Sequence, residues 1–387
     1  MSTDTDVLVA GGGFSGLFFA KELSKKGFAV RVFEEHNEIG HPNKCSGVVS
    51  LNSLKKLGLL PTERYLQNRF SKIMFYSPSA SKILLNFSSP DILVLNRYEI
   101  DNFLAEEATK NGAELSISSR IKDVYQDISS IRVKLADEKT VSSKYLVDAR
   151  GVTSYTNKEG IYNGIQSYAL YKNFEPDCMH VFFDKKIAQN FFAWLIPIDE
   201  YVAKVGLGTK SQPIESFNNF LSKINVKLPF NRNIAPIIVG GPIEHFIEGR
   251  MLHVGDSAGQ TKPTTGGGIY FGGVASLLAS EAFENKLQNQ GSSLVKDYEK
   301  KWFSKFKKET EYMKLARTYF EKMENYDIEK LFTTIKSSYS DQINLEMDYD
   351  FHISSLIKSL GVKSFLSIAM KIFGTSVKAS LKKFIYI

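Results

Sequence analysis

A glycine-rich loop near the start of the chain has the spacing of a phosphate-binding turn. Gly11, Gly13 and Gly16 follow the apolar segment 6–10 and precede residues 17–27, whose apolar positions recur at helical spacing. In such a unit the first glycine permits the turn, the second lets backbone N–H groups approach a diphosphate, and the third allows close helix–strand packing. The helix N-terminus then stabilises the phosphate charge. The spacing therefore predicts a nucleotide-binding loop.

An acidic residue closes the second strand of the same unit. Residues 29–33 are mostly apolar, and Glu34 follows them, about 20 residues beyond the loop, where a ribose-binding acid is expected. Its carboxylate can accept hydrogen bonds from both ribose hydroxyls. The unit predicts a dinucleotide site, and the competing interpretation is a glycine turn that binds no ligand.

A second glycine-rich loop decides which dinucleotide is expected. The apolar segment 251–254 runs into Gly255 and Asp256, and the glycines 266–268 precede an expected helix over 272–287. An acid at such a strand end can bind a ribityl hydroxyl, and the glycines can open a helix whose N–H groups point at a flavin or its phosphates. An enzyme that binds only NAD does not need this second loop. The sequence therefore predicts FAD, against the alternative of an exposed turn capped by Asp256.

The elements that must position these loops are scattered along the chain. Aromatic, strand-rich segments separate the nucleotide-type segments, and about the last hundred residues have mainly helical patterns. The expected fold is α/β, a Rossmann-type FAD-binding domain with an inserted antiparallel-sheet substrate domain and a helical C-terminal region. The boundaries are 1–60, 96–160 and 240–290 for the FAD-binding domain, 61–95 and 161–239 for the substrate domain, and 291–387 for the C-terminal region.

Composition narrows the class of protein. The 387 residues are 43% hydrophobic and 24% charged, which is ordinary for a globular protein and excludes general disorder. Apolar runs are too short for a membrane-spanning helix. The only cysteines, Cys45 and Cys178, predict neither a disulfide framework nor a metal site. We expect a cytoplasmic protein without a metal.

Most of the net charge of +7 lies at the end of the chain. From residue 351 onward there are six lysines and no Asp, Glu or Arg. Apolar residues recur there at helical spacing, namely Phe365, Ile368, Ala369, Ile372 and Phe373. A basic amphipathic helix can dock on the cytoplasmic face of an anionic membrane, although such a stripe can equally pack on the protein itself. Interleaved arginines and aromatic residues are absent, so no nucleic-acid partner is expected.

Taken in order, the motifs resemble those of the FAD-dependent geranylgeranyl reductases, including the archaeal digeranylgeranylglycerophospholipid reductases. The resemblance covers about 290 residues. Its motifs are the N-terminal glycine loop, Glu38–Cys45, Leu95–Asp101, Asp148–Gly151, Trp194–Pro197, Val205–Gly208 and Gly255–Ile269.

The resemblance implies roles for individual residues. Ser15 and Glu34 would contact the phosphate and adenosine ribose of FAD, Arg97 would reach the cofactor from its helix, and Ile121 would pack beside the adenine half. Together with the glycine loops, the expected FAD-binding residues are Gly11, Gly13, Ser15, Gly16, Glu34, Cys45, Ser46, Val48, Arg97, Ile121, Asp256, Gly267, Gly268 and Ile269. For Arg97, a surface salt bridge is the alternative interpretation.

Cys45 is the candidate catalytic residue. It follows a Gly-x-Pro turn in an irregular stretch, where a structural cysteine has little reason to occur. The resemblance places it against the flavin, where it can help to deliver a proton; the alternative is a small hydrophobic residue packed under the loop. Trp194 and Pro197 are expected to line a substrate cavity near the flavin.

The implied reaction is reduction of isolated double bonds in the geranylgeranyl chain of a prenyl lipid or prenylated quinone. Electrons would come from NAD(P)H or a ferredoxin-like protein. The segment Trp194–Pro197 also resembles a motif of flavin-dependent halogenases, so a halogenase or monooxygenase acting on an aromatic or quinone-like molecule is the main alternative. A non-catalytic FAD-binding or membrane-docking protein is a third possibility.

Overall fold

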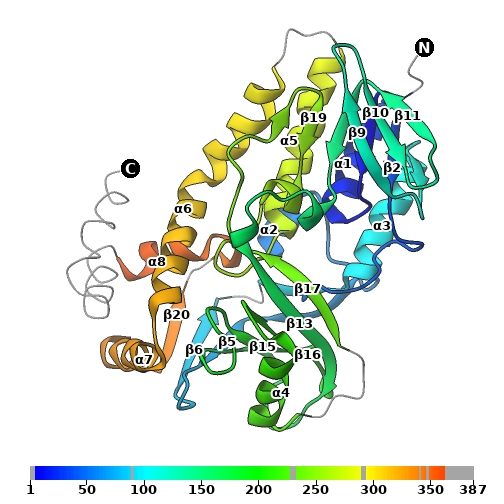
Figure 1. Cartoon of the computed structure of the whole chain (residues 1–387). Coiled ribbons are helices and arrows are strands. Elements are labelled where there is room, and N and C mark those ends of the chain that lie inside the picture. Colours follow the sequence, from blue (N-terminus) through cyan, green and yellow to red (C-terminus); the bar gives the residue numbers. More distant parts are fainter. Residues whose placement is uncertain are drawn as a thin grey trace.

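The computed structural model describes residues 5–88, 91–226, 232–288, 293–339, 341–345 and 348–361. Two large sheets lie in separate lobes, and the long helix α6 (Lys301–Lys322) runs beside both of them (Figure 1). The tail predicted to dock on membranes lies mostly outside the described residues, because the structure describes it only as far as Gly361. Within the described part, no helix is long and apolar enough to cross a membrane.

A six-stranded sheet forms the centre of the first lobe. Five neighbouring strands are parallel and β18 is antiparallel at one edge. Their order is β18 (Ile247–Glu248), β19 (Met251–His253), β12 (Tyr145–Asp148), β1 (Val7–Ala10), β2 (Val30–Phe33) and β8 (Glu114–Ser116).

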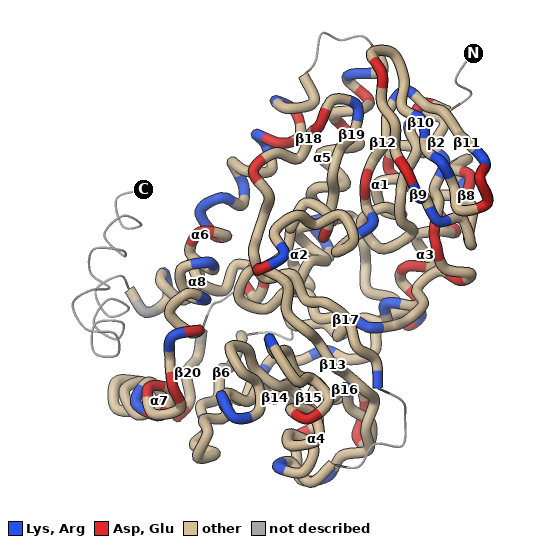
Figure 2. Tube along the Cα trace, in the orientation of Figure 1, with Lys and Arg blue, Asp and Glu red and all other residues tan. Residues whose placement is uncertain are grey.

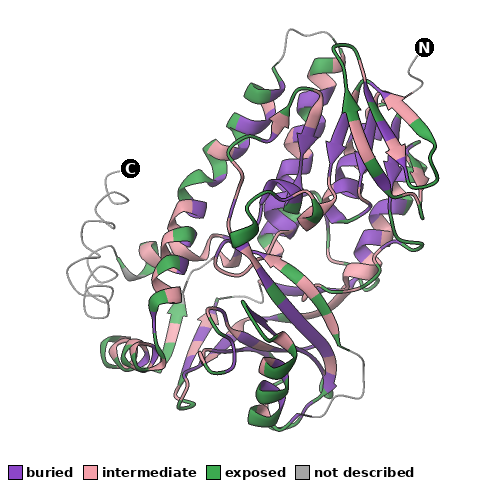
Figure 3. Cartoon of the chain, viewed as in Figure 1, coloured by how far each residue is buried: buried purple, intermediate pink, exposed green. Residues whose placement is uncertain are grey.

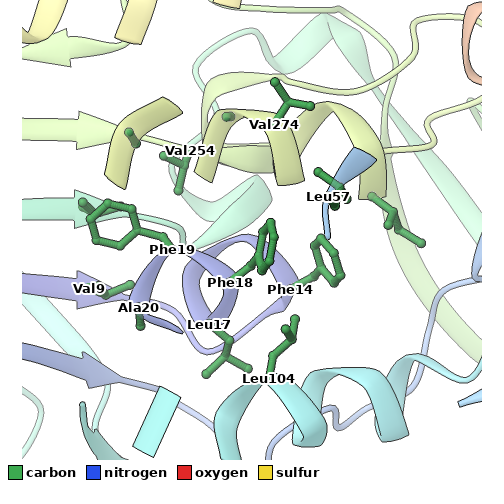
Figure 4. Close-up of a cluster of buried hydrophobic side chains, with 14 of the residues drawn as sticks. Val9, Phe14, Leu17, Phe18, Phe19, Ala20, Leu57, Leu104, Val254 and Val274 are labelled. Carbon is green, nitrogen blue, oxygen red and sulfur yellow. The ribbon is translucent and has the colours of Figure 1, made fainter. Parts of the chain in front are cut away.

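Successive side chains of β1 point to opposite faces of this sheet, and each face is covered by different elements. Val7 and Val9 point to one face, where helices α1 (Phe14–Ser24), α3 (Arg97–Lys110) and α5 (Ile269–Leu287) pack on the sheet (Figure 4). Leu8 and Ala10 point to the other face. A three-stranded antiparallel sheet covers that face, with strands β9 (Ile121–Gln126), β10 (Ile131–Leu135) and β11 (Thr140–Ser143).

A small antiparallel sheet connects the lobes. Its strands are β3 (Val48–Ser50), β7 (Ile92–Leu95) and β4 (Leu66–Phe70), and α2 (Leu51–Lys56) follows β3 directly. The segment 61–95, expected to belong wholly to the substrate domain, is therefore divided between this sheet and the second lobe.

The second lobe is an eight-stranded, largely antiparallel sheet. Only the pairs β14–β5 and β6–β20 are parallel. The strand order is β17 (Asn233–Ile238), β13 (Ile161–Leu170), β16 (Val202–Thr209), β15 (Ala193–Pro197), β14 (Cys178–Phe182), β5 (Lys72–Tyr76), β6 (Lys82–Phe87) and β20 (Gln342–Leu345). Helix α4 (Pro213–Ile224) packs on one face, and the C-terminal helices cover the other.

The C-terminal region is mainly helical. A π-helical turn (Val295–Lys300) leads into α6, which is followed by α7 (Asn325–Tyr339) and α8 (His352–Leu360). Their outer faces are exposed, whereas the central strands β1, β2 and β12 of the first lobe are mostly buried (Figure 3). Short 3-10 turns occur at Gly151–Thr153, Lys158–Gly160, Gly255–Ala258 and Tyr349–Phe351. The expected α/β architecture is confirmed, with one addition: β20, from the region expected to be helical, completes the second sheet.

Candidate functional site

One cavity of about 1910 Å³ extends from the first lobe into the second. Pockets for one small molecule usually measure about 300–1,000 Å³, so this cavity has room for two ligands. Glycine loops and polar side chains line the part in the first lobe. Apolar side chains of the eight-stranded sheet and the C-terminal helices line the rest.

The first glycine loop forms one side of the polar part. Gly11 has a φ of +109°, and a Cβ there would overlap the carbonyl oxygen of Ala149, so only glycine fits this turn. At Gly13 a Cβ would meet nothing, which leaves the backbone open to an approaching ligand. Helix α1 has neither a side-chain cap nor an acidic residue in its first turn. Its N-terminal N–H groups can therefore donate hydrogen bonds to phosphate oxygens.

Glu34 fixes the same loop from the end of β2. Its carboxylate accepts a 2.6 Å hydrogen bond from the Gly12 N–H and a 2.9 Å bond from the His36 N–H. It also contacts the Nδ1 atom of His36 at 2.5 Å. The residue is 8% exposed, and that remaining surface lies on the cavity. A ribose hydroxyl that reaches this carboxylate could donate a further hydrogen bond to it.

The second glycine loop lines the same cavity and packs against the first loop, because Gly255 lies directly beside Ser15. Asp256 is open to the cavity at the end of β19. Burial within the protein raises the pKa of this carboxyl, and Arg97 opposes the rise only in part. Gly267, Gly268 and Ile269 lie at the start of α5, which also lacks a side-chain cap and an acid in its first turn. Two uncapped helix N-termini and two carboxylates on one cavity fit the diphosphate and hydroxyl groups of FAD.

Arg97 lies inside the protein, not in a surface salt bridge. Its guanidinium holds Asp101 through two hydrogen bonds of 3.1 and 2.8 Å, and it lies 5.6 Å from the ring centre of Phe14. Although burial disfavours its charge, Asp101 and the Cys45 thiol together keep the pKa of Arg97 above its ordinary value. Its exposed surface is part of the cavity lining.

Cys45 lies on the loop that leads into β3. It is half-buried, lines the cavity and accepts a 3.4 Å hydrogen bond from the Gly47 N–H at its Sγ atom. Ser46 and Val48 line the cavity beside it. The arrangement gives the cavity a thiol next to a guanidinium.

The part of the cavity in the second lobe is here called the apolar arm. Its lining reflects the alternation of side chains along the strands. Every second residue of four adjacent strands faces it. These residues are Ile73 and Phe75, Ile83 and Leu85, Met179 and Val181, and Trp194 and Ile196. From the C-terminal region the apolar arm is lined by Phe320, Met323, Leu331, Phe332, Ile335, Ile343 and Leu356.

The structure places nearly all predicted site residues on this cavity. Ile121 lines it from β9 and Trp194 from β15, where the indole N–H donates to Gln166 at 3.1 Å. Gly16 does not line it, because it packs against the backbone of Gly11. Pro197 does not line it either. It lies on the other face of β15 from Trp194, so its expected place in the substrate site is wrong.

Sequence reasoning missed a buried ion pair behind the second glycine loop. The Lys262 ammonium lies 2.8 Å from Asp350, and both side chains are nearly inaccessible. The other Asp350 oxygen accepts the Ser50 N–H at 3.0 Å. The signal in the sequence was a lysine inside a glycine-rich loop whose one other charged residue is Asp256, but the partner of that lysine lies 88 residues away.

His352 was also missed as part of this site. Its Nε2 atom lies 2.8 Å from the Thr264 hydroxyl, and the residue lines the cavity. Burial lowers its pKa to about 3, so the ring is neutral near pH 7 and accepts from Thr264. Together with the Lys262–Asp350 pair, it fixes the C-terminal segment against the second glycine loop.

The structure predicts that FAD binding depends on Asp256. Replacing it with alanine should weaken FAD binding by roughly 10- to 100-fold, because a charged hydrogen-bond acceptor contributes about 1.5–3 kcal/mol. Glu34→Ala should act in the same direction, since it also frees the Gly12 N–H. Flavin absorbance per protein after gel filtration measures the effect, with the exposed Glu63→Ala as control. Full occupancy in both site variants would contradict this placement of FAD.

Comparisons with known proteins indicate an FAD-binding protein. An FAD binding domain family matches residues 4–193. The digeranylgeranylglycerophospholipid reductase of Methanocaldococcus jannaschii is 29% identical over 328 residues, covering 78% of this chain and 82% of that protein.

Solved structures share the fold. A geranylgeranyl bacteriochlorophyll reductase-like protein from Thermoplasma acidophilum superposes with a TM-score of 0.84 at 21% identity, covering 99% of this chain and all of the other. A flavin-dependent brominase reaches a TM-score of 0.65 at 17% identity, covering 85% of this chain and 92% of the other. The sequence resemblance to the reductases is therefore confirmed, and FAD is the cofactor.

Proposed function

We propose that this FAD-dependent oxidoreductase, which is similar to the geranylgeranyl reductases, reduces isolated double bonds in the prenyl chain of a lipid or quinone. The observation that supports this reaction is that one continuous cavity contains both the expected FAD site and the apolar arm. The polar part that fits FAD opens directly into the apolar arm, and the Cys45 thiol lines the same space. A substrate without polar groups at its reacting carbons would therefore lie next to a thiol.

The reaction has physical requirements that this cavity meets. An isolated double bond carries no charge by which a protein can hold it, so binding must come from burial, at about 25 cal/mol per Å² of apolar surface. The apolar arm provides that burial. Reduced FAD supplies the hydride, and a proton must arrive at the neighbouring carbon. Cys45 is our candidate for the proton donor, with Arg97 beside it to stabilise the charge left on sulfur.

Basic residues line the part of the cavity between α6 and α8. Lys308 and Lys358 are exposed there, and α6 carries many further cations (Figure 2). These charges support a prenyl substrate with an acidic headgroup, taken from an anionic membrane surface. As electron donor we propose NAD(P)H or a ferredoxin-like protein that binds transiently, because the sequence contains a single dinucleotide fingerprint.

The test is anaerobic incubation of the dithionite-reduced protein with a geranylgeranyl lipid, followed by mass spectrometry. The lipid should gain mass in steps of two hydrogens. Ile83→Trp should lower kcat/KM by about 10-fold or more, because a larger side chain in the apolar arm displaces substrate at a cost of roughly 1–3 kcal/mol. Ile83→Val is the matched control, and FAD absorbance should be unchanged in both.

Two outcomes would contradict the proposal. One is no mass gain in any prenyl lipid or prenylated quinone while the flavin is reoxidised by oxygen. The other is a hydroxylated or halogenated product when oxygen, a reductant and halide are present, which would favour the monooxygenase or halogenase interpretation.

A further inference from the structure

A lysine without a carboxylate partner is buried beneath the Cys45 loop. Lys204 lies on β16 between Ala203 and Val205 and has no exposed surface. Its ammonium donates to the carbonyl oxygens of Ser46 at 2.9 Å and Leu95 at 3.3 Å. Within the part of the chain that the structure describes, no carboxylate forms an ion pair with it. Burial lowers its pKa to about 8.

Such a lysine is unfavourable for stability. Moving an ammonium out of water is costly, and two carbonyl groups repay less than an opposite charge would. The other fully buried lysine near the site, Lys262, has the carboxylate of Asp350. Methionine would fill the position of Lys204 without this cost. Buried charges kept at a cost occur preferentially at functional sites.

The two carbonyl groups that Lys204 contacts lie where the Cys45 loop packs against the end of β7. The Leu95 N–H donates to the Gly47 carbonyl at 2.9 Å. Gly47 has a φ of +79°, and a Cβ there would overlap the Leu95 carbonyl oxygen. Lys204 therefore bonds to both segments where they approach most closely, immediately after Cys45.

The titratable groups around the thiol come from three elements. Arg97 faces it from α3, Lys204 from β16 and Tyr349 from the 3-10 turn before α8. Asp101 neutralises Arg97 through its paired hydrogen bonds. Lys204 has no such partner, so it adds positive charge near Cys45 beyond what the Arg97–Asp101 pair provides.

We infer that Lys204 is a positioning residue for Cys45: it fixes the loop through the Ser46 carbonyl and stabilises negative charge on the Cys45 sulfur. The inference rests on the proposed function only for the step in which Cys45 gives up a proton. In that step the S–H proton moves to the substrate carbon, sulfur keeps the electron pair, and the thiolate later regains a proton from water. A cation fixed next to the loop lowers the energy of the thiolate.

Alkylation of Cys45 by iodoacetamide, followed by mass spectrometry across a range of pH, tests this role without substrate. The thiolate is the reactive form, so Lys204→Met should slow alkylation by about 10-fold near pH 7. The difference should shrink above about pH 8, where Lys204 itself loses its proton. Lys204→Gln retains an N–H donor without the charge, and it should behave like Lys204→Met.

The matched control is Lys185→Met. Lys185 is a second partly buried lysine whose pKa is lowered to about 8, and it donates to the Phe320 carbonyl at 2.7 Å, away from Cys45. Its alkylation profile should equal that of the wild type. An unchanged profile in Lys204→Met would overturn the inference, as would equal slowing at every pH, which would indicate a displaced loop. Neither result depends on whether prenyl lipids are reduced, so the two proposals can fail separately.

Discussion

Replacing Cys45 with alanine should lower the rate of prenyl reduction by about 100-fold or more, while FAD stays bound. A positioned proton donor typically contributes 10²- to 10⁴-fold, and the described residues that line the apolar arm include no Asp, Glu or His. Cys45→Ser should be nearly as slow, because a hydroxyl gives up its proton much less readily than a thiol. The readout is the rate of flavin reoxidation when reduced protein meets a geranylgeranyl lipid under anaerobic conditions.

The other cysteine is the natural control for this experiment. Cys178 is fully buried on β14, does not line the cavity, and has a thiol whose pKa burial raises to about 12. Cys178→Ala should leave the turnover per bound FAD unchanged. If both Cys45 variants turn over at the wild-type rate, Cys45 is only a packing residue under its loop.

The parts of the site that sequence reasoning found are those built by local rules. The turn at Gly11, the acid Glu34 at the end of β2 and the Gly255–Asp256 strand end are each specified within a few residues. A strand, a left-handed glycine and a helix N-terminus then determine where N–H groups point. Such features can be predicted without knowing what packs on them.

The parts that were missed depend on contacts between distant segments. Lys204 and Ser46 are 158 residues apart, and Lys262 and Asp350 are 88 apart. Strand β20 joins the second sheet by pairing with β6, which precedes it by more than 250 residues. No local pattern specifies such pairings, since each depends on how the whole chain folds.

The error at Pro197 had a different cause. Its position came from a motif, although the alternation of β15 already separates it from Trp194 and Ile196. Successive side chains on a strand point to opposite faces, so residues three apart cannot both face one cavity. Here strand periodicity was the better guide.

The contact between the C-terminal segment and the second glycine loop leads to the largest expected effect on stability. Asp350→Ala should lower the free energy of unfolding by about 3–5 kcal/mol, because it leaves the buried Lys262 ammonium without a partner. It also removes the acceptor of the Ser50 N–H. Chemical denaturation of the FAD-bound protein measures the loss. The double variant Lys262→Met/Asp350→Leu should recover most of it, because apolar side chains can fill the space of both charges.

The pH dependence of this effect has a definite sign. Burial alone would raise the pKa of Asp350, but Lys262 outweighs it and holds that pKa below its ordinary value. Asp350 also keeps the pKa of Lys262 above its ordinary value despite burial. The contribution of Asp350 is therefore complete above its unfolded pKa, near 4, and is lost as the pH falls through the lower folded value. That of Lys262 is complete below about pH 10 and is lost above it. The wild type should exceed Asp350→Ala by a nearly constant margin from about pH 4 up to the pH at which the unpaired Lys262 of the variant loses its proton, and by a smaller margin above that pH. A margin that persists undiminished well below the pH at which Asp350 is protonated would show that the pair does not carry this stability.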